Sequence, residues 1–184
     1  MMHILVTSDT PLAEAARHMM AEQLDIVRDH VPSLSESADG TAVHETRKAI
    51  RRTFTLFKLF AGTFAPGELE PHRGMLRKLM RRLAPCRDLA VFRRQLMSFN
   101  TAADLPLLVL AEHMERRQEA AGRRLRAYLR RSKVQKRLDR YARFTNTEGA
   151  GLLPPGEKIP PVLVRHALPT LVFQRLGAVR AWGE

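Results

Sequence analysis

The sequence predicts an all-α protein, a helical bundle with long antiparallel helices. Apolar residues recur every three or four positions in several stretches, which is the period of a buried helix face. Prolines and glycines separate these stretches, and none of them alternates polar and apolar residues as a β-strand would. The chain has 184 residues, 45% of them hydrophobic, which is enough for one ordinary core.

The first helix is rich in Ala, Leu and Met. Thr10 followed by Pro11 predicts an N-cap with proline at the first helical position. We expect this helix to run to about Val31, because Pro32 follows. The polar residues 33–40 then predict a loop.

The second and third helices carry the clearest patterns. Pro66 and Gly67 end the second helix, and the third is expected from about Pro71 to Leu83, with Pro85 ending it. The apolar stripe of the second helix consists of Val43, Ile50, Phe54, Phe57, Phe60 and Phe64. The buried positions of the third are Met75, Leu76, Leu79 and Leu83.

Three capping residues predict the next helices. Asp88 caps a fourth helix, Asp104 caps a long fifth helix that begins at Pro106, and Ser132 caps a sixth. The apolar residues of the fourth are Leu89, Phe92, Leu96 and Phe99. Those of the fifth are Leu110, Met114, Ala121, Leu125 and Tyr128, and those of the sixth are Val134, Leu138, Tyr141 and Phe144.

Glycines and prolines in residues 148–161 predict a linker. A last helix follows over residues 162–182, with a kink at Pro169. We therefore expect a single domain in which residues 1–147 form a first helical bundle and residues 162–184 open a second half.

The chain is strongly basic. It has 31 Lys and Arg against 19 Asp and Glu, a net charge of +12, which favours a polyanionic partner. No transmembrane stretch or signal peptide stands at the N-terminus, and the single cysteine, Cys86, excludes a disulfide framework. We therefore expect a cytoplasmic protein that does not bind membranes.

The cations are ordered along two helices. In the second helix they fall three or four positions apart, in one band beside the apolar stripe, with Glu45 as the one acid of residues 44–58. The band consists of His44, Arg47, Lys48, Arg51, Arg52 and Lys58. The third helix repeats the pattern with Arg73, Arg77, Lys78, Arg81 and Arg82, and Arg87 follows. Two such stripes predict a groove whose guanidinium groups bind phosphate oxygens.

The chain resembles the CHAD family, the conserved-histidine α-helical domain, in three motifs that occur in the family's order. They are DTPLAEAAR at residues 9–17, VHETRKAIRRTFTLFKLF at 43–60 and LRKLMRRLAPCRDLAVF at 76–92. His44, Arg47, Arg51 and Arg52 match the family's His-x-x-Arg helix, and Arg77, Arg87 and Asp88 match the basic helix with its Arg-Asp pair.

This resemblance implies two pseudo-symmetric helical bundles around a basic channel that binds inorganic polyphosphate, in bacteria sometimes on polyphosphate granules. A full member carries a second His-x-x-Arg-x-x-x-Lys helix after the segment like residues 162–184, whereas this sequence stops at Glu184. We therefore expect the first half of the domain and a little more. Self-association that completes the groove is a further hypothesis. Phe54 stands where the family often continues the basic run, which predicts a shorter groove.

The remaining chemistry is that of a binding protein without a cofactor. A zinc helix motif would need a histidine at position 48, where Lys48 stands, and no serine or cysteine has the surroundings of a nucleophile. We expect no catalytic residue and no metal site. Two alternatives stay open, a nucleic-acid-binding protein and an accessory domain of a phosphate-metabolism enzyme. His44 either donates to phosphate or packs.

Overall fold

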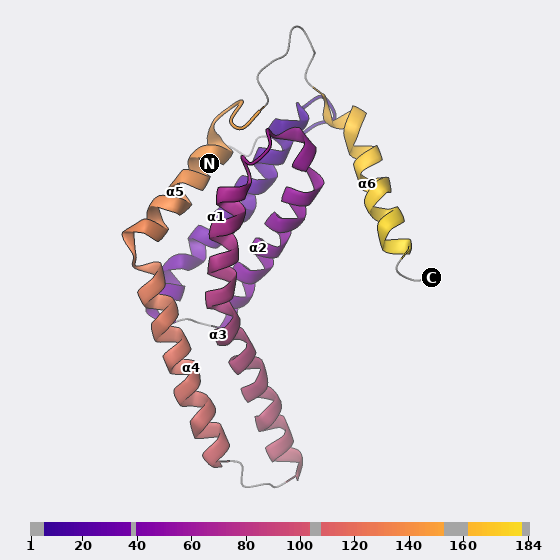
Figure 1. The fold of residues 1–184 in the computed structure, drawn as a ribbon. Coiled ribbons are helices and arrows are strands. Elements are labelled where there is room, and N and C mark those ends of the chain that lie inside the picture. Colours follow the sequence, from indigo (N-terminus) through magenta and orange to yellow (C-terminus); the bar gives the residue numbers. More distant parts are fainter. Residues whose placement is uncertain (1–5, 38–39, 104–107, 153–161, 182–184) are drawn as a thin grey trace.

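The computed structural model describes residues 6–37, 40–103, 108–152 and 162–181, and it confirms the all-α class (Figure 1). The helices are α1 (Leu12–Glu36), α2 (Gly40–Leu59), the 3-10 turn η1 (Ala61–Thr63), α3 (Glu70–Ala103), α4 (Leu108–Leu129), α5 (Ser132–Asn146) and α6 (Val164–Arg180). Helices α1 to α3 pack side by side, α5 lies against α1, and α3 and α4 form a long hairpin whose distal halves project beyond the other helices.

The core lies where α1, α2, α3 and α5 meet. The predicted stripe of α2 provides Val43, Ile50 and Phe57, each at most 1% exposed. Tyr141 of α5 is fully buried, and its ring meets that of Phe57 edge to face with the centroids 6.0 Å apart. Buried aliphatic side chains from α1 and α3 close the core, among them Met20, Leu24, Leu76, Leu79 and Leu83.

Pro32 does not end the first helix, contrary to the prediction, because α1 contains it and runs through Glu36. A proline inside a helix removes one hydrogen bond and costs about 3 kcal/mol. Leu34 lies beyond Pro32 and is fully buried. Burial of a leucine side chain stabilises the fold by about 1.5–3 kcal/mol, which offsets most of this cost. The predicted loop is therefore helical up to Glu36, and residues 38–39 lie outside the described residues.

Pro85 likewise fails to end the third helix. Helix α3 is continuous over 34 residues, so the predicted third and fourth helices are one. Pro85 is exposed, whereas Cys86 and Leu96 beyond it are buried against neighbouring helices. Burial along the α3–α4 hairpin favours continuation. Asp88 is an exposed residue in the middle of α3 and caps no helix, so that prediction was wrong.

Two further caps are displaced by one residue. Pro11, not Thr10, is at the N-cap of α1, and its ψ of 132° is extended because this stretch pairs with residue 163. Arg131, not Ser132, is at the N-cap of α5. Asp104 and Pro106, and most of the predicted linker, lie outside the described residues.

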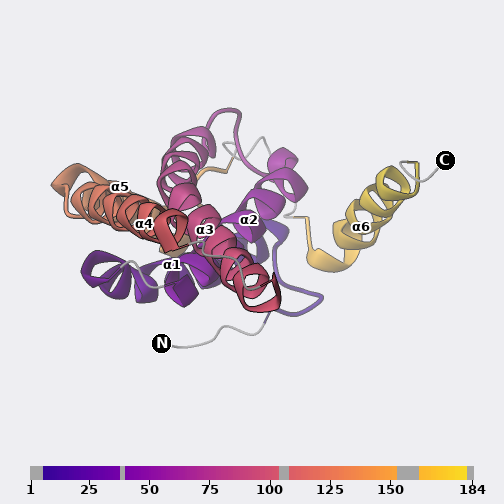
Figure 2. The ribbon, with the colours of Figure 1, turned by 90° about the horizontal axis from the view of Figure 1, so that it is seen from below.

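Helix α6 stands apart from the other helices, on the side of α2 (Figure 2). It continues through Pro169 and rests on the bundle with partly buried side chains such as Val164 and Leu171. The Arg175 guanidinium donates a hydrogen bond of 2.9 Å to the Lys58 carbonyl at the end of α2. The outer side of α6 exposes Val172, Phe173, Leu176 and Val179. None of the helices described combines the length and apolar character that a bilayer-spanning helix needs.

Candidate functional site

The basic residues of α2 follow the buried face of that helix along one flank. A helix turns by about 100° per residue. Residues separated by three, four or seven positions therefore lie close together on the surface, and four of the predicted site residues share this flank. They are His44, Arg47, Arg51 and Lys58. Arg51 and Lys58 are exposed, whereas His44 and Arg47 are half-buried.

Part of the basic set of α3 faces this flank. The guanidinium carbon of Arg73 lies 5.8 Å from the centroid of the Phe57 ring of α2. Arg77 and Arg87 fall on the same side of α3 as Arg73, because about 100° per residue brings positions 73, 77 and 87 together. Arg77 is exposed and Arg87 is half-buried. These three arginines therefore border the α2 flank.

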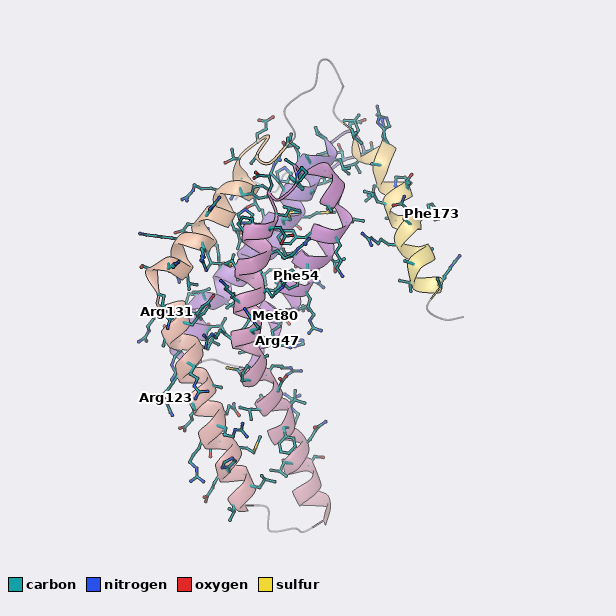
Figure 3. All side chains as sticks on the ribbon, viewed as in Figure 1. Arg47, Phe54, Met80, Arg123, Arg131 and Phe173 are labelled. Carbon is teal, nitrogen blue, oxygen red and sulfur yellow. The ribbon has the colours of Figure 1, made fainter. Side chains whose placement is uncertain are left out.

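We call the combined surface the basic seam, defined as His44, Arg47, Arg51 and Lys58 of α2 with Arg73, Arg77 and Arg87 of α3. Figure 3 shows Arg47 and Phe54 of α2 and Met80 of α3 between these two helices. Phe54 and Met80 are partly buried against the core. The seam therefore has an apolar floor, with cations on both helices along it.

Most of the seam charge is uncompensated. Arg73 forms an ion pair with Glu70, Nη1 to Oε1 2.7 Å. Across the described ranges, the other seam cations have no carboxylate within 4.0 Å. Like charges three or four residues apart on a helix destabilise it by about 0.2–0.5 kcal/mol per pair. An anion bound along the seam would relieve this repulsion.

Arg47 is the least satisfied of these residues. Its Nε and Nη1 atoms are buried and have no hydrogen-bond partner. A buried donor that loses its partner costs about 1–3 kcal/mol. An anionic oxygen that reached this guanidinium would accept from it and remove that cost, which makes Arg47 the strongest single pointer to an anion at the seam.

Five of the predicted site residues lie elsewhere. Lys48 is engaged with Glu45 of the same helix, Nζ to Oε2 2.5 Å, and this hydrogen bond lowers the pKa of Glu45. Arg52 lies further round α2, and Arg81 lies on α3 beside Lys78 and Arg82, with which it lines a hollow; both are exposed. Lys78 and Arg82 lie on the other flank of α3, which is described below.

That other flank faces α4 and α5. The guanidinium carbon of Arg82 lies 5.5 Å from the centroid of the Tyr128 ring of α4. Lys78 lines a hollow together with Arg137 and Arg140 of α5. The predicted site residues did not include these α5 cations. Their spacing of three residues on one helix face, beside the buried stripe of α5, was the signal that could have revealed them.

His72 is a core residue rather than a ligand candidate. It is 5% exposed, and its ring centroid lies 4.7 Å from that of Tyr141 and 4.8 Å from that of Phe144. Burial, together with the smaller effect of the Arg140 charge, lowers the pKa of His72 to about 4. The imidazole is therefore neutral in the folded protein near neutral pH.

This burial predicts a pH-dependent stability. The unfolded chain, with a histidine pKa of about 6.5, binds a proton that folded His72 excludes between pH 6.5 and 4. The contribution of His72 to the free energy of unfolding is complete above pH 6.5 and is lost as the pH falls toward 4. From pH 7 to 5 the loss of unfolding free energy is about 2 kcal/mol.

Urea unfolding at both pH values tests this assignment. The variant His72→Phe should remove this part of the pH dependence of the unfolding free energy, whereas His113→Gln, at an exposed position, should keep it. Equal pH dependence in both variants would contradict the assignment.

The described residues hold no cluster of metal-ligating side chains. Among the described residues, no three His, Cys, Asp or Glu side chains gather closely enough to hold a metal ion. Cys86 is buried, and burial raises the pKa of its thiol. The functional groups of the candidate site are cations and hydrogen-bond donors, held on helices.

Comparison with known proteins identifies the family of this chain. A search among curated proteins found no match to this chain. The family model of the CHAD domain matches residues 18–181, nearly the whole chain and both helices of the basic seam. The chain belongs to the CHAD domain family.

Proposed function

We propose that this protein binds inorganic polyphosphate along the basic seam. CHAD domains are associated with polyphosphate binding and are typically non-catalytic binding domains. The observation that carries the proposal is the uncompensated charge of the seam, with two guanidinium nitrogens of Arg47 buried and without a partner. Polyphosphate is linear and carries negative charge at every repeat.

The geometry of α2 suits a linear ligand. A rise of about 1.5 Å per residue puts Arg47 and Arg51 about 6 Å apart along the axis, and Arg51 and Lys58 about 10 Å apart. Successive cations therefore contact different phosphates of one chain. Each arginine guanidinium can donate two hydrogen bonds to phosphate oxygens, and Lys58 adds a point charge. The His44 imidazole adds a further N–H donor.

Rigid presentation adds to the affinity. The α2 flank adjoins a face whose side chains Ile50 and Phe57 are fully buried, so the backbone of α2 is held by the core. Stacking of Arg73 on Phe57 also limits the freedom of that side chain. Less ordering entropy is then lost when the chain binds.

The test removes three exposed seam charges at once. In the variant Arg51→Gln, Lys58→Gln, Arg77→Gln, the affinity of the seam for long-chain polyphosphate is expected to fall about 100-fold, because each contact contributes about 1 kcal/mol. The control removes three exposed arginines of α4 and the turn that follows it, as Arg116→Gln, Arg123→Gln, Arg130→Gln. Its affinity should change less than tenfold. Circular dichroism verifies the helical fold of both.

Calorimetry with duplex DNA and single-stranded RNA at the same ionic strength separates polyphosphate from nucleic acid. Equal affinity for all three polyanions would show a generic basic surface and overturn the proposal. Equal losses in the seam and control variants would also overturn it, because binding would then follow net charge alone.

A further inference from the structure

The flank of α3 that points away from the seam lines a second basic surface. Three adjoining hollows of about 500, 310 and 270 Å³ lie between α3, α4 and α5. The first two share Lys78, and the last two share His72 and Arg140. We call this continuous surface the α3–α5 trough. Its cations are Lys78, Arg81, Arg82, Arg137, Arg140 and Arg143.

The trough is as poorly neutralised as the seam. Within the described part of the chain, none of its six cations has a carboxylate within 4.0 Å. Two carboxylates stand at its rim, Glu68 and Glu70. Glu70 is held by Arg73 on the seam side of α3. The trough therefore keeps a strong positive potential inside a hollow, where field lines are focused.

The contacts inside the trough favour a phosphate chain over a nucleic acid. Arg82 lies over the Tyr128 ring, so this aromatic surface is already covered. His72 and Phe144, the other rings that line the hollows, are buried. Unpaired bases would find no free ring on which to stack. The phosphates of a duplex lie on the outside of a wide cylinder, whereas a polyphosphate chain is thin enough to enter a hollow.

We propose that the α3–α5 trough is a second polyphosphate site, so that one molecule binds two chains, one on each flank of α3. This inference rests on the proposed function for the seam. The two sites are separated by α3 itself, because Arg73 contacts α2 while Arg82 contacts α4. A protein with two such sites crosslinks long polyphosphate chains and condenses them.

Titration calorimetry with short-chain sodium polyphosphate tests the number of sites on the full chain. The wild type is expected to bind two chains. The trough variant Lys78→Gln, Arg137→Gln, Arg140→Gln and the seam variant Arg51→Gln, Lys58→Gln, Arg77→Gln are each expected to bind one. The α4 variant Arg116→Gln, Arg123→Gln, Arg130→Gln removes the same charge and is expected to bind two. Circular dichroism confirms that all variants are helical.

Light scattering with long-chain polyphosphate tests crosslinking. The wild type and the α4 variant are expected to form large scattering complexes, whereas the trough and seam variants are expected to form small soluble ones. If the wild type binds one short chain and the trough variant binds it unchanged, the second site is overturned and the seam stands. If only the trough variant loses binding, the seam assignment fails instead. Preferential binding of duplex DNA by the seam variant would overturn polyphosphate as the trough ligand.

Discussion

Replacing Phe57 by alanine is expected to lower the free energy of unfolding by about 3–5 kcal/mol. The Phe57 side chain is fully buried. Its ring centroid lies 6.0 Å from that of Tyr141 and 6.5 Å from that of Phe54, and Arg73 stacks on it from α3. One side chain thus joins α2, α3 and α5. Truncation loses its burial, leaves a cavity and removes the aromatic pairs.

Urea unfolding followed by circular dichroism measures the effect. The matched control is Phe92→Ala on the distal part of α3, where the side chain is 45% exposed. Its loss should stay below about 1 kcal/mol. Similar losses for the two variants would show that the packing of α2 on α5 is not the main source of stability.

The stripe that contains Phe57 could be predicted from the sequence, because a buried helix face has a fixed period. The two prolines could not be read in the same way. By the local rule Pro32 and Pro85 would end their helices, yet both helices continue, and Leu34 and Leu96 beyond the prolines are buried. Whether burial exceeds the cost of a missing hydrogen bond depends on neighbours that are distant in sequence.

The site shows the same division between local and tertiary information. The sequence indicated which helices are cationic and which residues carry the charge. Neighbouring residues such as Arg77 and Lys78 nevertheless lie on different flanks of α3, because successive residues are offset by about 100° around the helix axis. Which flank meets α2 and which meets α5 is decided by packing. Consequently one predicted groove becomes two surfaces, and Arg140 joins only through tertiary contact.

Replacing Arg17 by methionine is expected to cost about 3 kcal/mol, because removal of one partner leaves buried polar groups unpaired. Arg17 is a fully buried charged residue in α1. It forms an ion pair with Glu14, and its Nη1 donates a 2.9 Å hydrogen bond to the Ala150 carbonyl. Glu14 in turn accepts a hydrogen bond from the Gly149 amide, 3.3 Å. This network ties the turn after α5 to α1.

Arg28→Met provides the matched control on the same helix. Arg28 pairs with Asp139 of α5 at 3.5 Å, and the two side chains are 47% and 51% exposed. Exposed pairs contribute about 0–1 kcal/mol, because water screens both charges. The free energies of unfolding obtained from urea titrations should therefore differ between the two variants by about 2 kcal/mol or more. If both arginines cost the same, burial of Arg17 is not what makes its contacts valuable. In that case the turn that holds Ala150 would be anchored by the packing of Phe144 on Phe64, whose ring centroids are 5.6 Å apart.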